Sequence, residues 1–181
     1  DNLSSSKKNT LRGLHYQLKN PQGKLVRVSR GTVFDVALDI RKGSSSFGKY
    51  FTTILDDQKF HQLYMPPGVA HGFCVISNFA DFEYKCTDFY DPADEGNILW
   101  SDPDLSIPWP IDNPYLSKKD VEFQMGNFLA DPLKGRLWEG ASHAIEHGMK
   151  MHKAIDIFTD SHPLVSKSKS RLGKKGVLKG V

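Results

Sequence analysis

The stretch VFDVALDI at residues 33–40 decides the fold class. In an extended chain its side chains divide into two sets: Phe34, Val36, Leu38 and Ile40 on one side, and Val33, Asp35, Ala37 and Asp39 on the other. The first set is entirely apolar. This alternation predicts a β-strand with one face buried in a hydrophobic core.

The sequence around this stretch has the same character. From Leu11 to about Tyr90, short β-type runs are separated by Gly, Pro, Ser and Asn, and no helical period lasts three turns. The run FEYKCTDFY at 82–90 would place Tyr84 and Tyr90 on one face if it formed an unbroken strand. Many short strands joined by such turns predict an all-β domain, either a sandwich or a jelly-roll barrel.

The rest of the chain divides into segments of different composition. Residues 91–120 are rich in Asp, Pro and Trp, and we expect an irregular wrap in which Trp100 and Trp109 are packing anchors. Residues 136–158 have helical apolar spacing. We therefore predict a domain at 1–123, a peripheral and partly helical extension at 124–165, and a disordered basic tail at 166–181.

Charge and cysteine content exclude several classes of protein. The formal net charge is +3, but residues 150–181 hold eight Lys or Arg and two Asp, so the excess lies in the tail. That tail lacks interleaved aromatics, so nucleic-acid binding is not expected. With two cysteines and no apolar run near 18 residues, we expect neither a disulfide framework nor a membrane span. We expect the protein in a reducing cytoplasm. Because the chain starts at Asp1, we expect a processed or truncated start.

Two residues on successive strand-like runs suggest chemistry. LRGLH at 11–15 carries His15, and QGKLVRV at 22–28 carries Lys24. A base beside a fixed cation is what proton abstraction next to a carbonyl requires, because the cation stabilises the enolate oxygen. Strict alternation sends Arg12 and His15 to opposite faces, so a shared site requires a β-bulge near Gly13.

Each of these residues also has a structural alternative. A histidine in a strand is often only a hydrogen-bonded structural residue, and a lysine at a strand start often faces water. Lys24, however, shares a face with Val26 and Val28, which favours a barrel mouth or a buried anionic partner.

Metal binding is not expected. His71 in MPPGVAHGF at 65–73 is similar to the second motif of the cupin superfamily, but LRGLHYQ offers only His15 where such sites draw further ligands. His143 and His147, with His152 beyond them, lack the HExxH pattern, and a solvated histidine face is the expectation.

Six separated segments together carry a family resemblance. The segments are LRGLHYQ, QGKLVRV, GTVFDVALDIRKGSSSFGKY, MPPGVAHGF, FEYKCTDFYDPADEGNILWSDPDLSIPWP and LSKKD. In order, over residues 1–120, they resemble the dTDP-4-dehydrorhamnose 3,5-epimerase family. The resemblance implies a cupin-type jelly roll without metal or other cofactor, a homodimer, and epimerisation at C3 and C5 of a dTDP-4-keto-6-deoxyhexose through enolates. A monoepimerase and a catalytically silent nucleotide-sugar binder remain the alternatives.

The resemblance also implies roles for single residues. His15 is the base, Asp120 holds its far nitrogen, Tyr84 is the acid on the opposite face of the sugar, and Lys24 lies near the 4-keto oxygen. The implied substrate contacts are Asp1, Asn2, Arg12 at the pyrophosphate, His71, Glu95, Lys119, and Tyr90 against thymine. Two departures are expected: an N-terminal portion of the family is absent here, and the chain beyond about Phe123 has no recognised counterpart.

Overall fold

The computed structural model describes residues 1–118, 120–122, 125 and 140–150. The chain divides into two units, Asp1–Val121 and Glu122–Val181, and each is treated by itself below.

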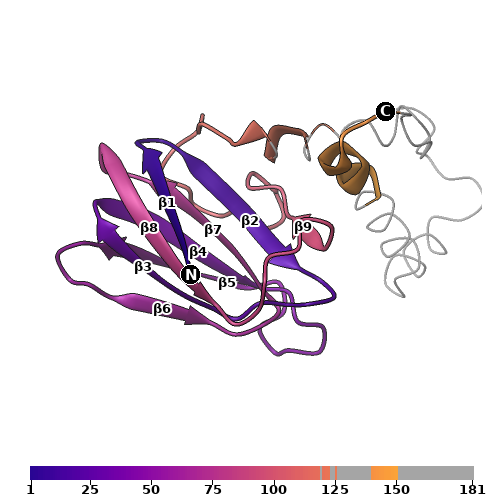
Figure 1. Ribbon diagram of the computed structural model, residues 1–181, viewed down its shortest axis with the longest axis horizontal. Coiled ribbons are helices and arrows are strands. Elements are labelled where there is room, and N and C mark those ends of the chain that lie inside the picture. Colours follow the sequence, from indigo (N-terminus) through magenta and orange to yellow (C-terminus); the bar gives the residue numbers. More distant parts are fainter. Residues whose placement is uncertain (119, 123–124, 126–139, 151–181) are drawn as a thin grey trace, which may run out of the picture. The chain divides into compact units, whose positions relative to one another are not determined.

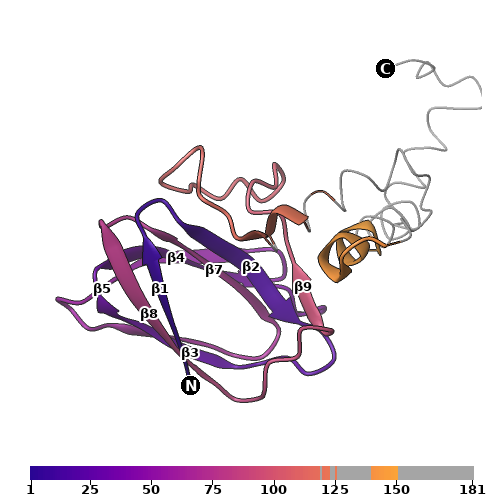
Figure 2. The ribbon, with the colours of Figure 1, turned by 45° about the horizontal axis from the view of Figure 1, so that its top comes forward.

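The first unit is built from two antiparallel sheets that face each other (Figures 1 and 2). One sheet has four strands, in the order β1 (Asn2–Lys7), β8 (Phe79–Cys86), β3 (Lys24–Arg30) and β6 (Gln62–Met65). The other has five, in the order β5 (Tyr50–Asp56), β4 (Thr32–Asp39), β7 (Val69–Val75), β2 (Leu11–Gln17) and β9 (Glu95–Asn97). The predicted all-β, jelly-roll class is confirmed.

Strand β4 is buried on both faces, whereas the sequence predicted one core face. Val33 and Ala37 belong to the core between the sheets. Val36 and Leu38 belong to a second core on the outside of the five-stranded sheet, which the segment at 98–109 covers. The segment is anchored there by Trp109, whose indole packs edge-on against Phe34 at 5.8 Å between ring centroids.

Two local predictions need correction. The run at 82–90 is not one strand, because β8 ends at Cys86 and Tyr90 lies beyond it. Its partner β3 begins at Lys24, and there the Thr87 side-chain oxygen accepts a hydrogen bond from the Gly23 amide at 2.8 Å. The expected irregular wrap at 91–120 also contributes a short strand, β9, which pairs with β2.

Of the second unit, the structure describes 122, 125 and 140–150. Residues 143–150 are helical, and Ile145 and Met149, four positions apart, are its buried apolar residues. The Ser142 hydroxyl accepts a hydrogen bond from the Ile145 amide at 3.4 Å, as an N-cap residue does. The rest of the predicted helix and the tail at 166–181 lie outside the described residues, so the predicted domain boundaries stay a prediction. No helix in the described ranges is long and apolar enough to cross a membrane.

Candidate active site

A cavity of about 810 Å³ opens between the two sheets of the first unit. Such a volume suits a small organic ligand. Every site residue predicted from the sequence lines it, except Lys119, which lies outside the described residues. The predicted residues in its wall are Asp1, Asn2, Arg12, His15, Lys24, His71, Tyr84, Tyr90, Glu95 and Asp120.

A bulge in β2 brings Arg12 and His15 to the same cavity. The pairing of β2 with β7 shifts register between these two residues. Gly13 lies at the shift with φ of 122°, and a Cβ there would stand 2.5 Å from the Cα of Gly72 on β7. The bulge predicted from the sequence is confirmed, and the close approach of the two strands requires glycine at this point.

His15 is held by a buried carboxylate. Its Nε2 lies 2.6 Å from Oδ1 of Asp120, and Asp120 is fully buried. Burial alone would raise the pKa of Asp120, but hydrogen bonds from His15 and Ser117 outweigh it, and this pKa lies below its ordinary value. The ionised carboxylate can only accept, so Nε2 of His15 donates and Nδ1 of the neutral ring is left to accept a proton.

A capping motif places Asp120. In LSKKD, the Ser117 hydroxyl accepts from the Asp120 amide at 3.1 Å and donates to Asp120 Oδ2 at 2.7 Å. The Ser117 amide also donates to Oδ2 at 3.3 Å. This is the reciprocal S-x-x-D box that begins a helix, a signal present in the sequence that our prediction of Asp120 did not use. Asn97, from β9, adds a hydrogen bond of 2.9 Å to Oδ1.

Lys24 enters the cavity from the opposite sheet. It is the first residue of β3, with Val26 and Val28 of the same face packed in the core between the sheets. Burial lowers the pKa of its ammonium, and Cys86 and Asp35 oppose this shift in part. A poorly hydrated cation of this kind interacts strongly with a developing negative charge.

Tyr84 also comes from the four-stranded sheet. It lies on β8, with its ring 4.8 Å from that of Phe82 and 6.1 Å from that of His71 between centroids. Burial raises the pKa of Tyr84 well above its ordinary value, and Ser4 and Arg12 offset only part of the rise. The phenol is therefore protonated at neutral pH and able to donate.

A second histidine–carboxylate pair lies deeper. His71 Nε2 lies 2.9 Å from Oδ2 of Asp35, and both side chains are buried. The sequence predicted His71 as a site residue but did not point to Asp35. The sequence feature that could have identified Asp35 is its place in VFDVALDI on the same side as Val33 and Ala37, because an acid among apolar residues needs a partner.

The cavity mouth is aromatic and polar. Tyr90 is exposed, and its hydroxyl donates to Oε2 of Glu95 at 2.9 Å. Phe89 beside it, which was not predicted from the sequence, also lines the cavity and is 91% exposed. Arg12 is oriented by a hydrogen bond from Nε to the Ser6 hydroxyl at 3.2 Å. The mouth therefore offers flat apolar surface next to a guanidinium, which suits a base and its phosphates.

The arrangement can move protons on two sides of one ligand. His15 belongs to the five-stranded sheet, while Lys24 and Tyr84 belong to the four-stranded sheet. A ligand between the sheets would meet a base on one side and a protonated phenol on the other.

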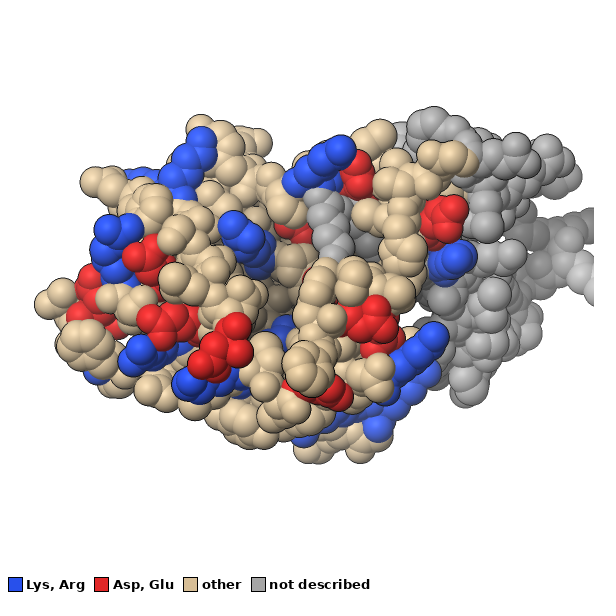
Figure 3. Space-filling model, viewed as in Figure 1, with Lys and Arg blue, Asp and Glu red and all other residues tan. Residues whose placement is uncertain are grey.

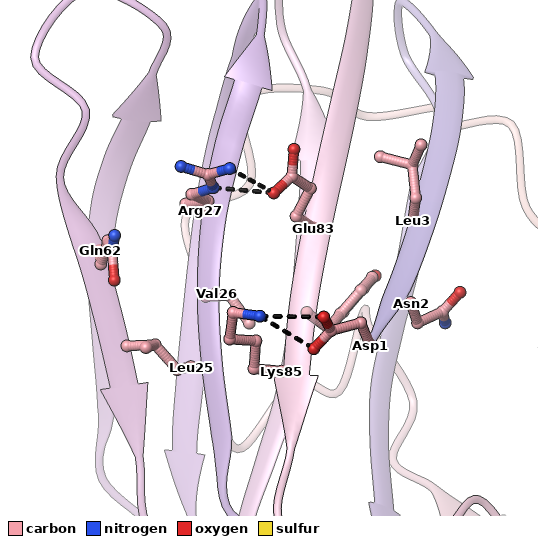
Figure 4. A pocket seen from close by; sticks show the side chains of 10 residues that line it. Asp1, Asn2, Leu3, Leu25, Val26, Arg27, Gln62, Glu83 and Lys85 are labelled. Carbon is pink, nitrogen blue, oxygen red and sulfur yellow. Dashed lines mark hydrogen bonds and ion pairs between the residues drawn. The ribbon is translucent and has the colours of Figure 1, made fainter.

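A second groove, of about 390 Å³, lies on the outer face of the four-stranded sheet (Figure 4) and shares Asp1, Asn2 and Tyr84 with the cavity. Its charges are already paired: Arg27 with Glu83 at 2.7 Å, and Lys85 with Asp1 at 2.9 Å. In Figure 3, which has the same view as Figure 1, acidic and basic side chains are likewise interspersed over the surface of this unit. The groove offers matched charges rather than a reactive group.

The described residues contain no cluster of three or more His, Cys, Asp and Glu that could hold a metal ion. The His143 and His147 rings lie 5.2 Å apart between centroids on the helical segment. His152 lies outside the described residues.

Comparison with known proteins finds matches to two protein families along the chain. Residues 1–127 match the family of dTDP-4-dehydrorhamnose 3,5-epimerase. Residues 114–180 match the acyl carrier protein phosphodiesterase family. This second match supplies a counterpart for the chain beyond Phe123, where the sequence motifs alone indicated none.

The similar proteins agree with the first match. An epimerase of this name from Shigella flexneri is 54% identical over 125 residues, which is 68% of this chain and 69% of that protein. One from Neisseria gonorrhoeae is 52% identical over 122 residues, 67% of this chain but 37% of that protein. A Legionella pneumophila epimerase, solved with dTDP-4-keto-L-rhamnose, has a TM-score of 0.64 and 52% identity, covering 66% of this chain and 64% of that structure. The chain thus spans between a third and about two thirds of these proteins.

Proposed function

Because this chain belongs to the dTDP-4-dehydrorhamnose 3,5-epimerase family, we propose that it epimerises dTDP-4-dehydro-6-deoxy-D-glucose at C3 and C5 to dTDP-4-dehydro-L-rhamnose. The observation that carries the proposal is the pairing of His15 with buried Asp120 on one sheet, opposite Tyr84 and Lys24 on the other. A base held in one tautomer and an acid on the far side are the two groups that inversion at carbon needs.

Each inversion would proceed in two proton transfers. His15 Nδ1 takes the proton from the carbon beside the 4-keto group, and the electron pair moves onto the ketone oxygen as an enolate. Lys24 stabilises that oxygen. Tyr84 then donates its proton to the opposite face of the same carbon, and the oxygen becomes a ketone again. Exchange with water restores neutral His15 and the Tyr84 phenol.

Substrate binding would use the mouth of the cavity. We assign Arg12 to the pyrophosphate, for which a planar fork of donors is suited, and Tyr90 to stacking on thymine. Asp1 and Asn2 would contact the nucleotide, and His71, Glu95 and Lys119 would contact the sugar nucleotide. No metal or organic cofactor takes part in these steps.

A single-position epimerase is the second candidate. The chain is also 42% identical over 122 residues to a dTDP-4-dehydrorhamnose 3-epimerase from Streptomyces niveus. The same base, acid and cation serve either outcome, and the fit of the sugar in the cavity decides between them. A silent nucleotide-sugar binder would not need His15 and Tyr84 on opposite sides of the ligand.

Exchange with heavy water separates these candidates. The protein is incubated with dTDP-4-keto-6-deoxyglucose in deuterium oxide, and the label is located in the sugar by NMR. We expect deuterium at both C3 and C5. Deuterium at one carbon alone would identify a monoepimerase, and no label above a protein-free control would leave only the binder.

We further propose that the protein acts as a homodimer in the cytoplasm. Both cysteines are free, Cys74 buried and Cys86 exposed, which agrees with a reducing compartment. Sedimentation at several protein concentrations would measure the oligomeric state.

A further inference from the structure

The chemistry proposed above leaves one buried carboxylate unused. Asp35 on β4 is fully buried. Its Oδ2 accepts the hydrogen bond from His71, and its Oδ1 has no hydrogen-bond partner among the described residues. A half-satisfied carboxylate inside the protein is unusual and calls for an explanation beyond packing.

Packing and stability do not explain Asp35. By alternation it faces the core between the sheets, with Val33 and Ala37 on the same side of β4. Burying an ionised carboxylate in such a place costs more than its hydrogen bond returns, and an apolar residue of similar size would suit the core better.

Two neighbours connect Asp35 to the catalytic cavity. The first is His71, which β7 places between Ala37 on β4 and His15 on β2 in the strand register. Because the carboxylate only accepts, the hydrogen bond fixes the proton of neutral His71 on Nε2 and leaves Nδ1 as an acceptor. His71 lines the cavity, so its tautomer decides what it can accept from a ligand.

The second neighbour is Lys24. Lys24 faces the space between the sheets from β3, opposite the sheet that carries Asp35. Burial disfavours the charge of Lys24, and Cys86 on β8, followed by Asp35, opposes this effect. From β2, the His15 carbonyl accepts a long hydrogen bond of 3.5 Å from the Lys24 ammonium. Of the groups that stabilise the positive charge of Lys24, Asp35 is the carboxylate.

We propose that Asp35 is a positioning residue of the site: its buried carboxylate fixes the tautomer of His71 and adds negative charge on the sheet that faces Lys24. The inference rests on the proposed epimerase activity and deepens it. The cavity then holds two carboxylate–histidine pairs whose histidines lie side by side on the five-stranded sheet, one that prepares the base His15 and one that orients His71.

The main test is Asp35→Asn, which keeps the shape of the side chain and removes its charge. Asp39→Asn is the matched control, because Asp39 lies on the same strand and its carboxylate is held by Arg41, Ser44 and Ser46, away from the cavity. We expect Asp35→Asn to lower kcat for deuterium exchange about 10- to 100-fold, with a smaller change in KM. Asp39 is also buried, so Asp39→Asn controls for the loss of a buried carboxylate on β4, and its kcat should stay within about twofold of the wild type because Asp39 does not line the cavity.

The pH profile supplies a readout that a purely structural role would not move. Without the negative charge, Lys24 loses its proton at lower pH, so the alkaline limb of kcat/KM should shift to lower pH in Asp35→Asn and not in Asp39→Asn. An unshifted limb and a wild-type kcat would overturn the proposal. An equal loss in both variants, with equal loss of thermal stability, would also overturn it and assign Asp35 a structural role.

The wild-type protein alone gives an independent readout. Nitrogen-15 NMR should show His71 protonated on Nε2 at neutral pH, and a proton on Nδ1 instead would contradict the proposal. This separates it from the proposed function: a wild type that exchanges no deuterium would end the epimerase assignment, while the His71 tautomer would still decide whether Asp35 prepares the cavity wall.

Discussion

The cavity between the sheets and the groove on the outer face of the four-stranded sheet contain the same kinds of charged residue in opposite circumstances. In the groove, Arg27 meets Glu83 and Lys85 meets Asp1 in contact with solvent, where paired charges contribute little. In the cavity, Lys24 and Asp120 are withdrawn from water and their pKa values are shifted. Charges become chemically useful where the fold removes water without neutralising them, and this difference can be tested residue by residue.

The largest effect is expected from His15→Ala. Loss of the proposed general base should lower deuterium exchange at the sugar carbons by about 10³-fold. His61→Ala is the matched control, because His61 is an exposed histidine outside the cavity. Rate constants for both variants are measured by NMR under saturating substrate. Equal rates would show that the base is another group.

Lys24→Met should come next. Removing the cation that we propose stabilises the enolate oxygen is expected to lower the rate about 10²-fold. Since burial lowers the pKa of Lys24, wild-type activity should fall as pH rises through that lowered value, and this limb should vanish in the variant. Lys42→Met, at an exposed position outside the cavity, should keep the wild-type profile. An alkaline limb that survives in Lys24→Met would assign it to a different group.

Asp120→Asn should have a moderate effect. The amide keeps the shape but no longer stabilises the protonated ring of His15, and we expect a rate about 10- to 100-fold lower. Asp104→Asn, an exposed aspartate outside the cavity, serves as the control. A rate within about twofold of the wild type would mean that the hydrogen bond of 2.6 Å has no part in preparing the base.

In the groove, Arg27→Ala should have the smallest effect. The Arg27–Glu83 pair is solvent-exposed, so its loss should leave both the exchange rate and the melting temperature unchanged within error. A marked loss of exchange would show that the groove belongs to the functional site, and the contrast between the two regions would fail.

Much of the first unit could be predicted from the sequence because the features concerned depend on residues that are close together in the chain. Alternation in VFDVALDI predicted a strand, and the conflict between Arg12 and His15 required the bulge that lies at Gly13. The end of β8 at Cys86 was missed because it depends on where the partner strand β3 begins, and that residue, Lys24, is distant in the sequence. The burial of both faces of β4 was missed for a similar reason, since 98–109 covers one of them.

Local pattern pointed to His15 and Lys24, and the rest of the candidate site was predicted by family resemblance. Asp120 is far from His15 in the chain, and only the folded sheets and the Ser117 cap bring the two together. Asp35 could have been suspected from its place among apolar residues, but its partner His71 lies 36 positions away. Which distant segments come together is set by topology, which periodicity does not encode.

The central claim is that one sheet supplies the base and the other supplies the acid, and Tyr84→Phe in deuterium oxide tests it most directly. Without the phenol proton, His15 can still remove and return a proton on its own side. We predict that deuterium enters the sugar while its configuration is retained, and that net inversion falls by about 10²-fold or more. Inversion at the wild-type rate in this variant would contradict the two-sided account.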